Sequence, residues 1–279
     1  MGSACTKPIT NNALNSNASI SNASTLEIDA FMAQVRPLDL IVFRGSEGVS
    51  TMITELEKLE TGCNTISHVE VAITREWCSK IKGLAAEFPK DMLLSWGSTL
   101  SGKLNDGVDN AETGKMKFGV QVRVLRDIVA AYLRNNGANV GLCRLINNPI
   151  ERGSTEPVEQ YLERTRLLKY KIAGAYDEYN GVLYNPKPLT LLGALFPALR
   201  SLRHAVDTVI NKFVATNKWL FCSEFVAALY CYIGVITDSS DGNVDGVTLS
   251  PEDILPVDFL GVDKDTNGLV VPICQIPPI

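Results

Sequence analysis

The sequence predicts an α+β fold in which a small antiparallel sheet packs against helices. Two kinds of segment carry this prediction: short apolar runs rich in β-branched residues, which are typical of strands, and longer runs with apolar residues at helical spacing. The composition agrees, because 46% hydrophobic and 20% charged residues in 279 describe an ordinary folded protein. Helical segments surround the strand-like runs, which is an α+β pattern.

The first half of the chain supplies the predicted sheet. A short helix is expected at 25–35, with Thr25 as its N-cap. A second helix is expected at 50–62, where helical spacing ends at a glycine, and a third at 127–136. The apolar or alternating runs that predict strands lie at 38–45, 66–74, 91–98, 118–125 and 140–146.

The second half is predicted to be mainly helical. A charged helical segment covers 156–169, and a long apolar one covers 189–215, where Pro197 predicts a kink or two separate helices. The run Leu189 to Leu199 is too short to span a bilayer, so it is either a core helix or a lid facing membrane or substrate. The last predicted helix lies within 219–235.

The N-terminal segment 1–25 is expected to be a flexible spacer, because it is rich in Asn and Ser and poor in large apolar residues. It begins MGSACT, the pattern for N-myristoylation on Gly2, and Cys5 offers a palmitoylation site that would strengthen membrane binding. Chance is the alternative, since many proteins begin Met-Gly. Without an apolar leader, we expect an intracellular, membrane-anchored or virion-associated protein rather than a secreted one.

Charge and cysteine usage exclude several classes. The net charge of −5 gives no broad basic surface, so nucleic acid is not an expected partner. Seven cysteines without a CxxC pair, together with only two histidines, predict neither a disulfide scaffold nor a metal centre, and no cofactor is expected.

The segment WLFCSEFVAALYCYIGV raises the question of chemistry. Cys222 stands where the helix begins, a position that favours a reactive thiolate, although most free cysteines are buried hydrophobes. The candidate bases are His68, in the alternating strand SHVEVAI, and His204, which has basic neighbours and is expected at the surface or at a helix cap. The remaining cysteines lack a helix-start setting and are expected to be core or surface thiols.

Four motifs together resemble one family. RPLDLIVFRG, SHVEVAI, FCSEFVAALY and SPEDILP occur in that order over about residues 36 to 260. This arrangement is similar to the NlpC/P60 superfamily of papain-like enzymes, in the circularly permuted branch where the histidine precedes the cysteine. That branch contains the YaeF/YiiX type, relatives of lecithin:retinol acyltransferase and members in large DNA viruses. The resemblance implies a permuted papain-like domain over 26–279, with a helical insertion at about 155–217.

The resemblance implies that Cys222 is the nucleophile and His68 the general base. The family orients its histidine with a polar residue on the next strand, but that place falls near Gly97, with Ser95 and Ser98 beside it. Glu70 shares the strand face of His68 and is the expected substitute. Leu38 also departs from the family, which usually has Gly before Asp-Leu-Ile.

The predicted function is thiol-dependent hydrolysis or acyl transfer on a peptide or lipid acyl substrate. The alternatives are a non-catalytic structural or virion-associated binding protein with the same fold, and a bare lipid-anchored adaptor. Structural rather than functional roles are expected for the other polar residues. Glu224 should stabilise the helix start, Asp39 should form hydrogen bonds at a strand start, and Gln121 and Arg123 should face solvent. The aromatic side chains of Tyr176, Tyr179 and Tyr184 are expected to pack in the core. The sequence leaves the oligomeric state open.

Overall fold

Six strands form one antiparallel sheet in the order β4-β3-β2-β1-β5-β6. The computed structural model describes residues 23–44, 67–82, 89–99, 107–134, 139–184, 220–236 and 270–276. The strands are β1 (Leu40–Arg44), β2 (His68–Ile73), β3 (Leu94–Thr99), β4 (Gly119–Val124), β5 (Asn139–Leu145) and β6 (Val270–Ile276). The predicted α+β class and antiparallel sheet are therefore confirmed.

The described helices are α1 (Ala23–Met32), α3 (Leu125–Arg134), α4 (Val158–Tyr179) and α7 (Cys222–Ile233). Three predictions need small corrections. Helix α1 begins at Ala23, so Thr25 lies inside it rather than capping it. Helix α3 begins two residues before the predicted start, directly at the end of β4. The charged segment expected at 156–169 continues ten residues further, to Tyr179.

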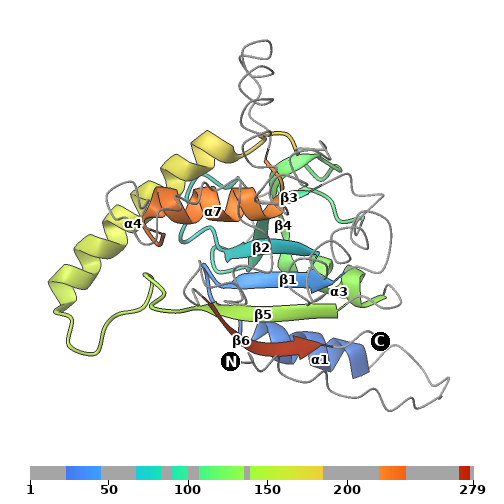
Figure 1. Ribbon diagram of the computed structural model, residues 1–279, viewed down its shortest axis with the longest axis horizontal. Helices are drawn as coiled ribbons and strands as arrows, with labels where there is room; N and C mark the ends of the chain where they lie inside the picture. Colours follow the sequence, from blue (N-terminus) through green and yellow to red (C-terminus); the bar gives the residue numbers. More distant parts are fainter. Residues whose placement is uncertain are drawn as a thin grey trace, which may run out of the picture.

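The two faces of the sheet bury different helices. Val69, Val71 and Ile73 of β2 belong to a core cluster that includes Phe225 and Leu229 of α7, and α4 packs on α7. Ala72 lies on the other face, in a second cluster with residues of α1 and α3. Because side chains alternate along a strand, His68 and Glu70 share the face of Ala72. Figure 1 shows α7 running alongside β2, with α4 extending beyond it.

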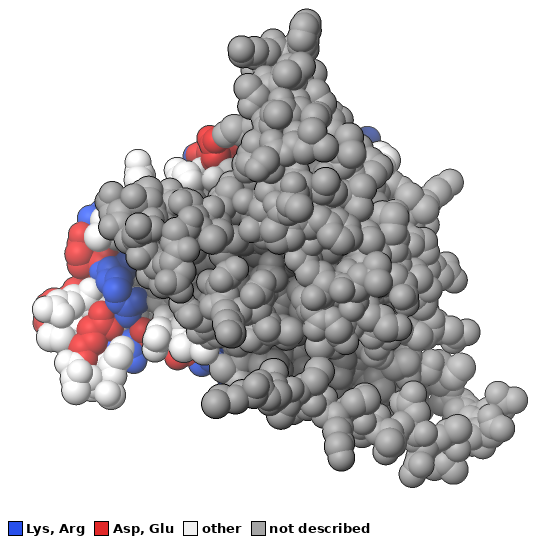
Figure 2. Space-filling model, viewed as in Figure 1, with Lys and Arg blue, Asp and Glu red and all other residues white. Residues whose placement is uncertain are grey.

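Helix α4 carries charges of both signs, and they are the charged side chains most visible in Figure 2. Arg166 pairs with Glu163 within the helix, and Arg164 pairs with Glu156 just before it. Ion pairs near the surface contribute little stability, because solvent screens them. The helix is held instead by its buried side, Leu168, Ile172, Ala175 and Tyr176.

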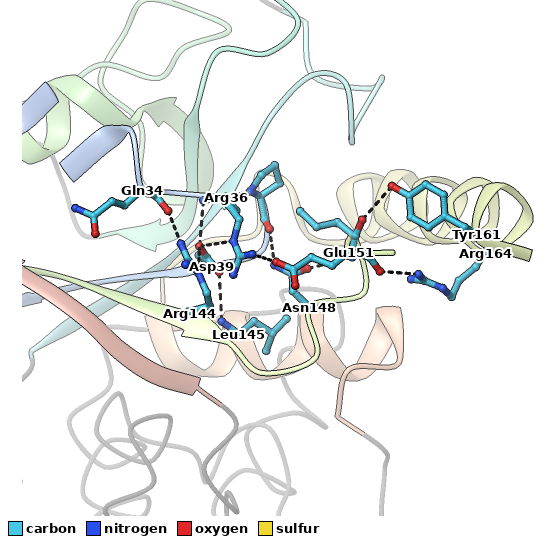
Figure 3. A network of polar contacts seen from close by, with 11 residues as sticks. Gln34, Arg36, Asp39, Arg144, Leu145, Asn148, Glu151, Tyr161 and Arg164 are labelled. Carbon is cyan, nitrogen blue, oxygen red and sulfur yellow. Dashed lines mark hydrogen bonds and ion pairs between the residues drawn. The ribbon is translucent and has the colours of Figure 1, made fainter. Parts of the chain in front are cut away.

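A polar network ties the start of β1 to the end of β5 (Figure 3). The buried Asp39 carboxylate accepts hydrogen bonds from the backbone N–H groups of Arg36 and Leu145, and the Arg144 guanidinium lies 3.5 Å from it. Burial raises the pKa of Asp39, and these partners oppose that shift. Asp39 thus bonds at a strand start, as the sequence predicted.

Leu38, directly before Asp39, has φ of +67°, the left-handed region that favours glycine. The side chain is fully buried in the core, and its carbonyl accepts a hydrogen bond from the Tyr230 hydroxyl of α7. The backbone here has the conformation that glycine adopts most easily, while leucine adds a buried side chain.

Several predictions lie outside the described residues. They include the flexible segment with Gly2 and Cys5, the helix at 50–62, His204, the apolar run 189–199 and the SPEDILP motif. Among the helices that the structure describes, none has the length and apolar character needed to cross a membrane.

Candidate active site

His68 and Glu70 stand on the same face of β2, two residues apart. The imidazole Nε2 and the carboxylate Oε1 are 2.7 Å apart, the distance of a strong hydrogen bond. The imidazole also packs against the Phe43 ring of β1, with ring centroids 5.7 Å apart. A hydrogen bond at one ring nitrogen and an aromatic neighbour together fix the orientation of the imidazole.

Gly97 on β3 makes room for the Glu70 side chain. Continuing the register of β2 and β3 places Gly97 directly opposite Glu70 on the same face. A Cβ atom at Gly97 would lie 2.5 Å from Cγ and 2.7 Å from Cδ of Glu70. Gly97 is therefore matched to a carboxylate that crosses from the neighbouring strand.

The Glu70 carboxylate is fully buried, and partners from three strands surround it. Ser95 of β3 donates its hydroxyl to Oε2, and Arg123 of β4 forms an ion pair with Oε1. Burial alone would raise the pKa of Glu70, but the Arg123 guanidinium, His68 and the Ser95 hydroxyl lower it to about 2. Glu70 is therefore ionised at neutral pH.

This arrangement corrects the predicted exposure of two β4 side chains. Arg123 is 1% exposed and Gln121 is 2% exposed, because β4 is covered on both faces. Gln121 donates to the Thr99 hydroxyl and to the Lys117 carbonyl. The alternation of β4 correctly placed both side chains on one face. It gave no sign that this face is the one carrying Glu70.

Cys222 is the first residue of α7, and Phe221 precedes it as N-cap. Glu224 accepts a hydrogen bond from the Phe221 backbone N–H at 2.9 Å, so its carboxylate stabilises the helix start as predicted. The segment before the helix is anchored as well. Leu220 donates its N–H to the Leu183 carbonyl and accepts a hydrogen bond from the Ser98 hydroxyl of β3.

Although α7 packs against the other face of the sheet, Cys222 lies close enough to His68, the first residue of β2, to favour the charged form of the imidazole. Burial alone would lower the pKa of His68, but the charge and hydrogen bond of Cys222, together with those of Glu70, raise it well above its ordinary value. Since Nε2 faces Glu70, Nδ1 is the ring nitrogen left for the thiol. The structure thus brings Cys222, His68 and Glu70 into one row.

The row is sheltered from solvent. Cys222 is 2% exposed and His68 is 7% exposed. Tyr184, for which the sequence predicted packing, is close enough to Cys222 and Glu224 that their charges raise its pKa, in addition to a larger effect of burial. Of the other cysteines with described side chains, Cys78 and Cys143 are buried and Cys231 is half-buried, and burial raises the pKa of Cys78 to about 11.

Within the described residues, no group of three or more His, Cys, Asp or Glu side chains is placed to hold a metal ion. The row is instead built from a thiol, an imidazole and a carboxylate, which is an arrangement suited to nucleophilic catalysis. In comparisons with known proteins, no family model and no curated sequence matches the chain.

Proposed function

We propose that this protein is a thiol-dependent hydrolase or acyltransferase with a permuted papain-like domain. The observation that carries the proposal is the row Cys222–His68–Glu70, in which a thiol at a helix start lies beside an imidazole that is hydrogen-bonded to a carboxylate. Nucleophile, base and orienting group are the three parts that such catalysis needs. The permuted order and the predicted insertion at 155–217 belong to the same proposal.

The proposed reaction starts from a Cys222 thiolate and a His68 imidazolium. The sulfur attacks the carbonyl carbon of an amide, ester or thioester, and a C–S bond forms while the carbonyl oxygen takes the negative charge. First-turn backbone N–H groups have no partner within the helix, so those at Cys222 and its neighbours are suited to stabilise this oxyanion.

The imidazolium then gives its proton to the leaving amine, alcohol or thiol as that bond breaks, which leaves a thioester on Cys222. Water or another acceptor loses a proton to the now neutral His68 and attacks the thioester carbon. The acyl group departs, and the thiolate–imidazolium pair returns. Glu70 stays ionised throughout and stabilises the imidazolium.

A thiol-reactive probe tests the proposal. The rate of Cys222 alkylation by iodoacetamide, followed by peptide mass spectrometry between about pH 5 and pH 9, should remain high at the acid end for the wild-type protein. In His68→Ala the rate at the acid end should fall by about ten-fold or more, because an unassisted thiol is only a few per cent ionised near neutral pH. Equal rates in both proteins would contradict the proposal.

The burial of the site favours a second candidate function. The protein would then be a binding protein with the same fold that does not catalyse a reaction. With Cys222 only 2% exposed, a substrate must displace part of the surroundings to reach the sulfur. The same probe separates the two functions. A binding protein would label slowly at every pH, at a rate that His68→Ala does not change.

A further inference from the structure

A buried arginine lies behind the proposed active site. Arg123 stands on β4, two strands away from His68, and is 1% exposed. Its register partner on β3 is Ser95, and the register of β2 and β3 pairs Ser95 with Ala72. Arg123, Ser95 and Glu70 therefore lie on one face of three adjacent strands. A buried guanidinium is rare unless it is paired, and this one is paired with Glu70.

Arg123 and His68 contact the same carboxylate oxygen of Glu70. Both the guanidinium and the imidazole Nε2 contact Oε1 of Glu70, while Ser95 takes Oε2. Each carboxylate oxygen is thus held by a neighbour other than His68. The guanidinium and the hydroxyl fix the plane of the carboxylate, and Oε1 remains directed at the imidazole.

The balance of charge explains why a cation is needed. Cys222 and His68 together carry no net charge, whether as thiol and imidazole or as thiolate and imidazolium. Glu70 adds one negative charge in a fully buried position, and Arg123 cancels it. A buried carboxylate without such a partner takes up a proton at a much higher pH.

We propose that Arg123 is a positioning residue of the thiol site, a buried cation that keeps Glu70 ionised and aimed at His68. This inference rests on the proposed function. Among the described residues, the charged groups that face Glu70 are His68 on its own strand and Arg123 on β4. Cys222 of α7 acts on His68 and not directly on Glu70. Helix α3 covers this face of the sheet with the apolar Leu125, Ile128 and Val129.

The test compares pH profiles of Cys222 alkylation by iodoacetamide in the full chain. In Arg123→Met, the carboxyl group should protonate within the measured range, so the rate near pH 5 should fall about ten-fold or more relative to the rate near pH 8. Arg123→Lys keeps the charge and should retain the wild-type profile. Glu70→Gln has no carboxyl group to titrate. Its alkylation rate should be lower than that of the wild type, but the rate should not show the additional fall near pH 5 expected for Arg123→Met.

The double variant Arg123→Met with Glu70→Gln separates a role through Glu70 from a merely structural one. Its profile should match that of Glu70→Gln alone, because Arg123 acts only through the carboxylate. The double variant should also be more stable than Arg123→Met, in which the buried Glu70 carboxylate has lost its guanidinium partner.

Three results would overturn the inference. The first is a wild-type pH profile of alkylation in folded Arg123→Met, and the second is an additional fall in rate near pH 5 in Arg123→Lys. The third is an alkylation rate in the double variant below that of Glu70→Gln. If Arg123→Met does not fold, the last two comparisons decide. The proposed function fails separately, when the wild-type rate does not depend on His68.

Discussion

Gly97→Ala is the substitution whose effect follows most directly from the site. The glycine has no positive φ, so alanine is acceptable to the backbone, and in a strand it would ordinarily stabilise by about 0.5–1 kcal/mol. The obstacle is Glu70, whose Cγ, Cδ and Oε1 would lie 2.5, 2.7 and 2.9 Å from the new Cβ. The carboxylate must retreat by about 1 Å to reach ordinary van der Waals contact.

A retreat of that size breaks the 2.7 Å hydrogen bond between Glu70 and His68. Hydrogen bonds to charged groups contribute about 1.5–3 kcal/mol. If that stabilisation is lost from the imidazolium, the equilibrium between the neutral pair and the thiolate–imidazolium pair shifts by about ten- to hundred-fold. Alkylation of Cys222 near pH 6 should slow by the same factor.

The matched control is Gly153→Ala, where the nearest atom to a new Cβ lies at an ordinary 3.5 Å and no site residue is touched. Its alkylation rate should equal that of the wild type. Circular dichroism and the midpoint of urea unfolding establish that both variants fold. A folded Gly97→Ala protein with the wild-type rate would refute the argument that Gly97 makes room for a carboxylate that His68 needs.

Three further predictions concern the same elements. Exchanging the two opposed residues, Glu70→Gly with Gly97→Glu, should recover much of the alkylation rate lost in Glu70→Gly alone, because the carboxylate returns to the same face from the neighbouring strand; no recovery would contradict the register argument. At Leu38, where φ is +67°, the Gly variant should be at least as stable in urea as the Ala variant, since glycine avoids about 1–2 kcal/mol of left-handed strain. At the equally buried Leu40 of β1 the Ala variant should be the more stable of the two. The same order of stability at both positions would count against strain at Leu38. The pKa of Glu70 is lowered to about 2 from 4.5, so its ionisation stabilises the folded state above about pH 4.5 and that contribution is lost as the pH falls towards 2; the difference in unfolding free energy between wild type and Glu70→Gln should narrow over that range, and a constant difference would be inconsistent with the shift.

Much of the sheet could be predicted because its strands obey simple patterns. The alternating run around His68 and the apolar run around Ile41 became β2 and β1. The strand β6 was missed, because Pro272 interrupts its apolar run and proline is disfavoured within sheets. The fold places β6 at the edge of the sheet, where a proline is tolerated.

The site was predictable only in part, because its key pairings join distant segments. The period of the strand put Glu70 on the face of His68, and helical spacing put Cys222 at a helix start. The burial of Arg123 had no local signal, since its partner lies 53 residues earlier in the chain. Similarly, the sequence shows at Gly97 only a glycine where a polar residue is expected. The structure shows that the Glu70 side chain fills the space beside this glycine.

The protonation state of His68 tests the central claim most directly. The chain contains two histidines, so ring ¹⁵N resonances can be assigned with a single His204→Gln variant. We predict that His68 is an imidazolium near pH 7.5 in the wild type. In Cys222→Ala the pKa of His68 should fall, because the sulfur that favours the charged ring is gone. A neutral His68 ring in the wild-type protein at that pH, or the same titration with and without the Cys222 sulfur, would contradict the account.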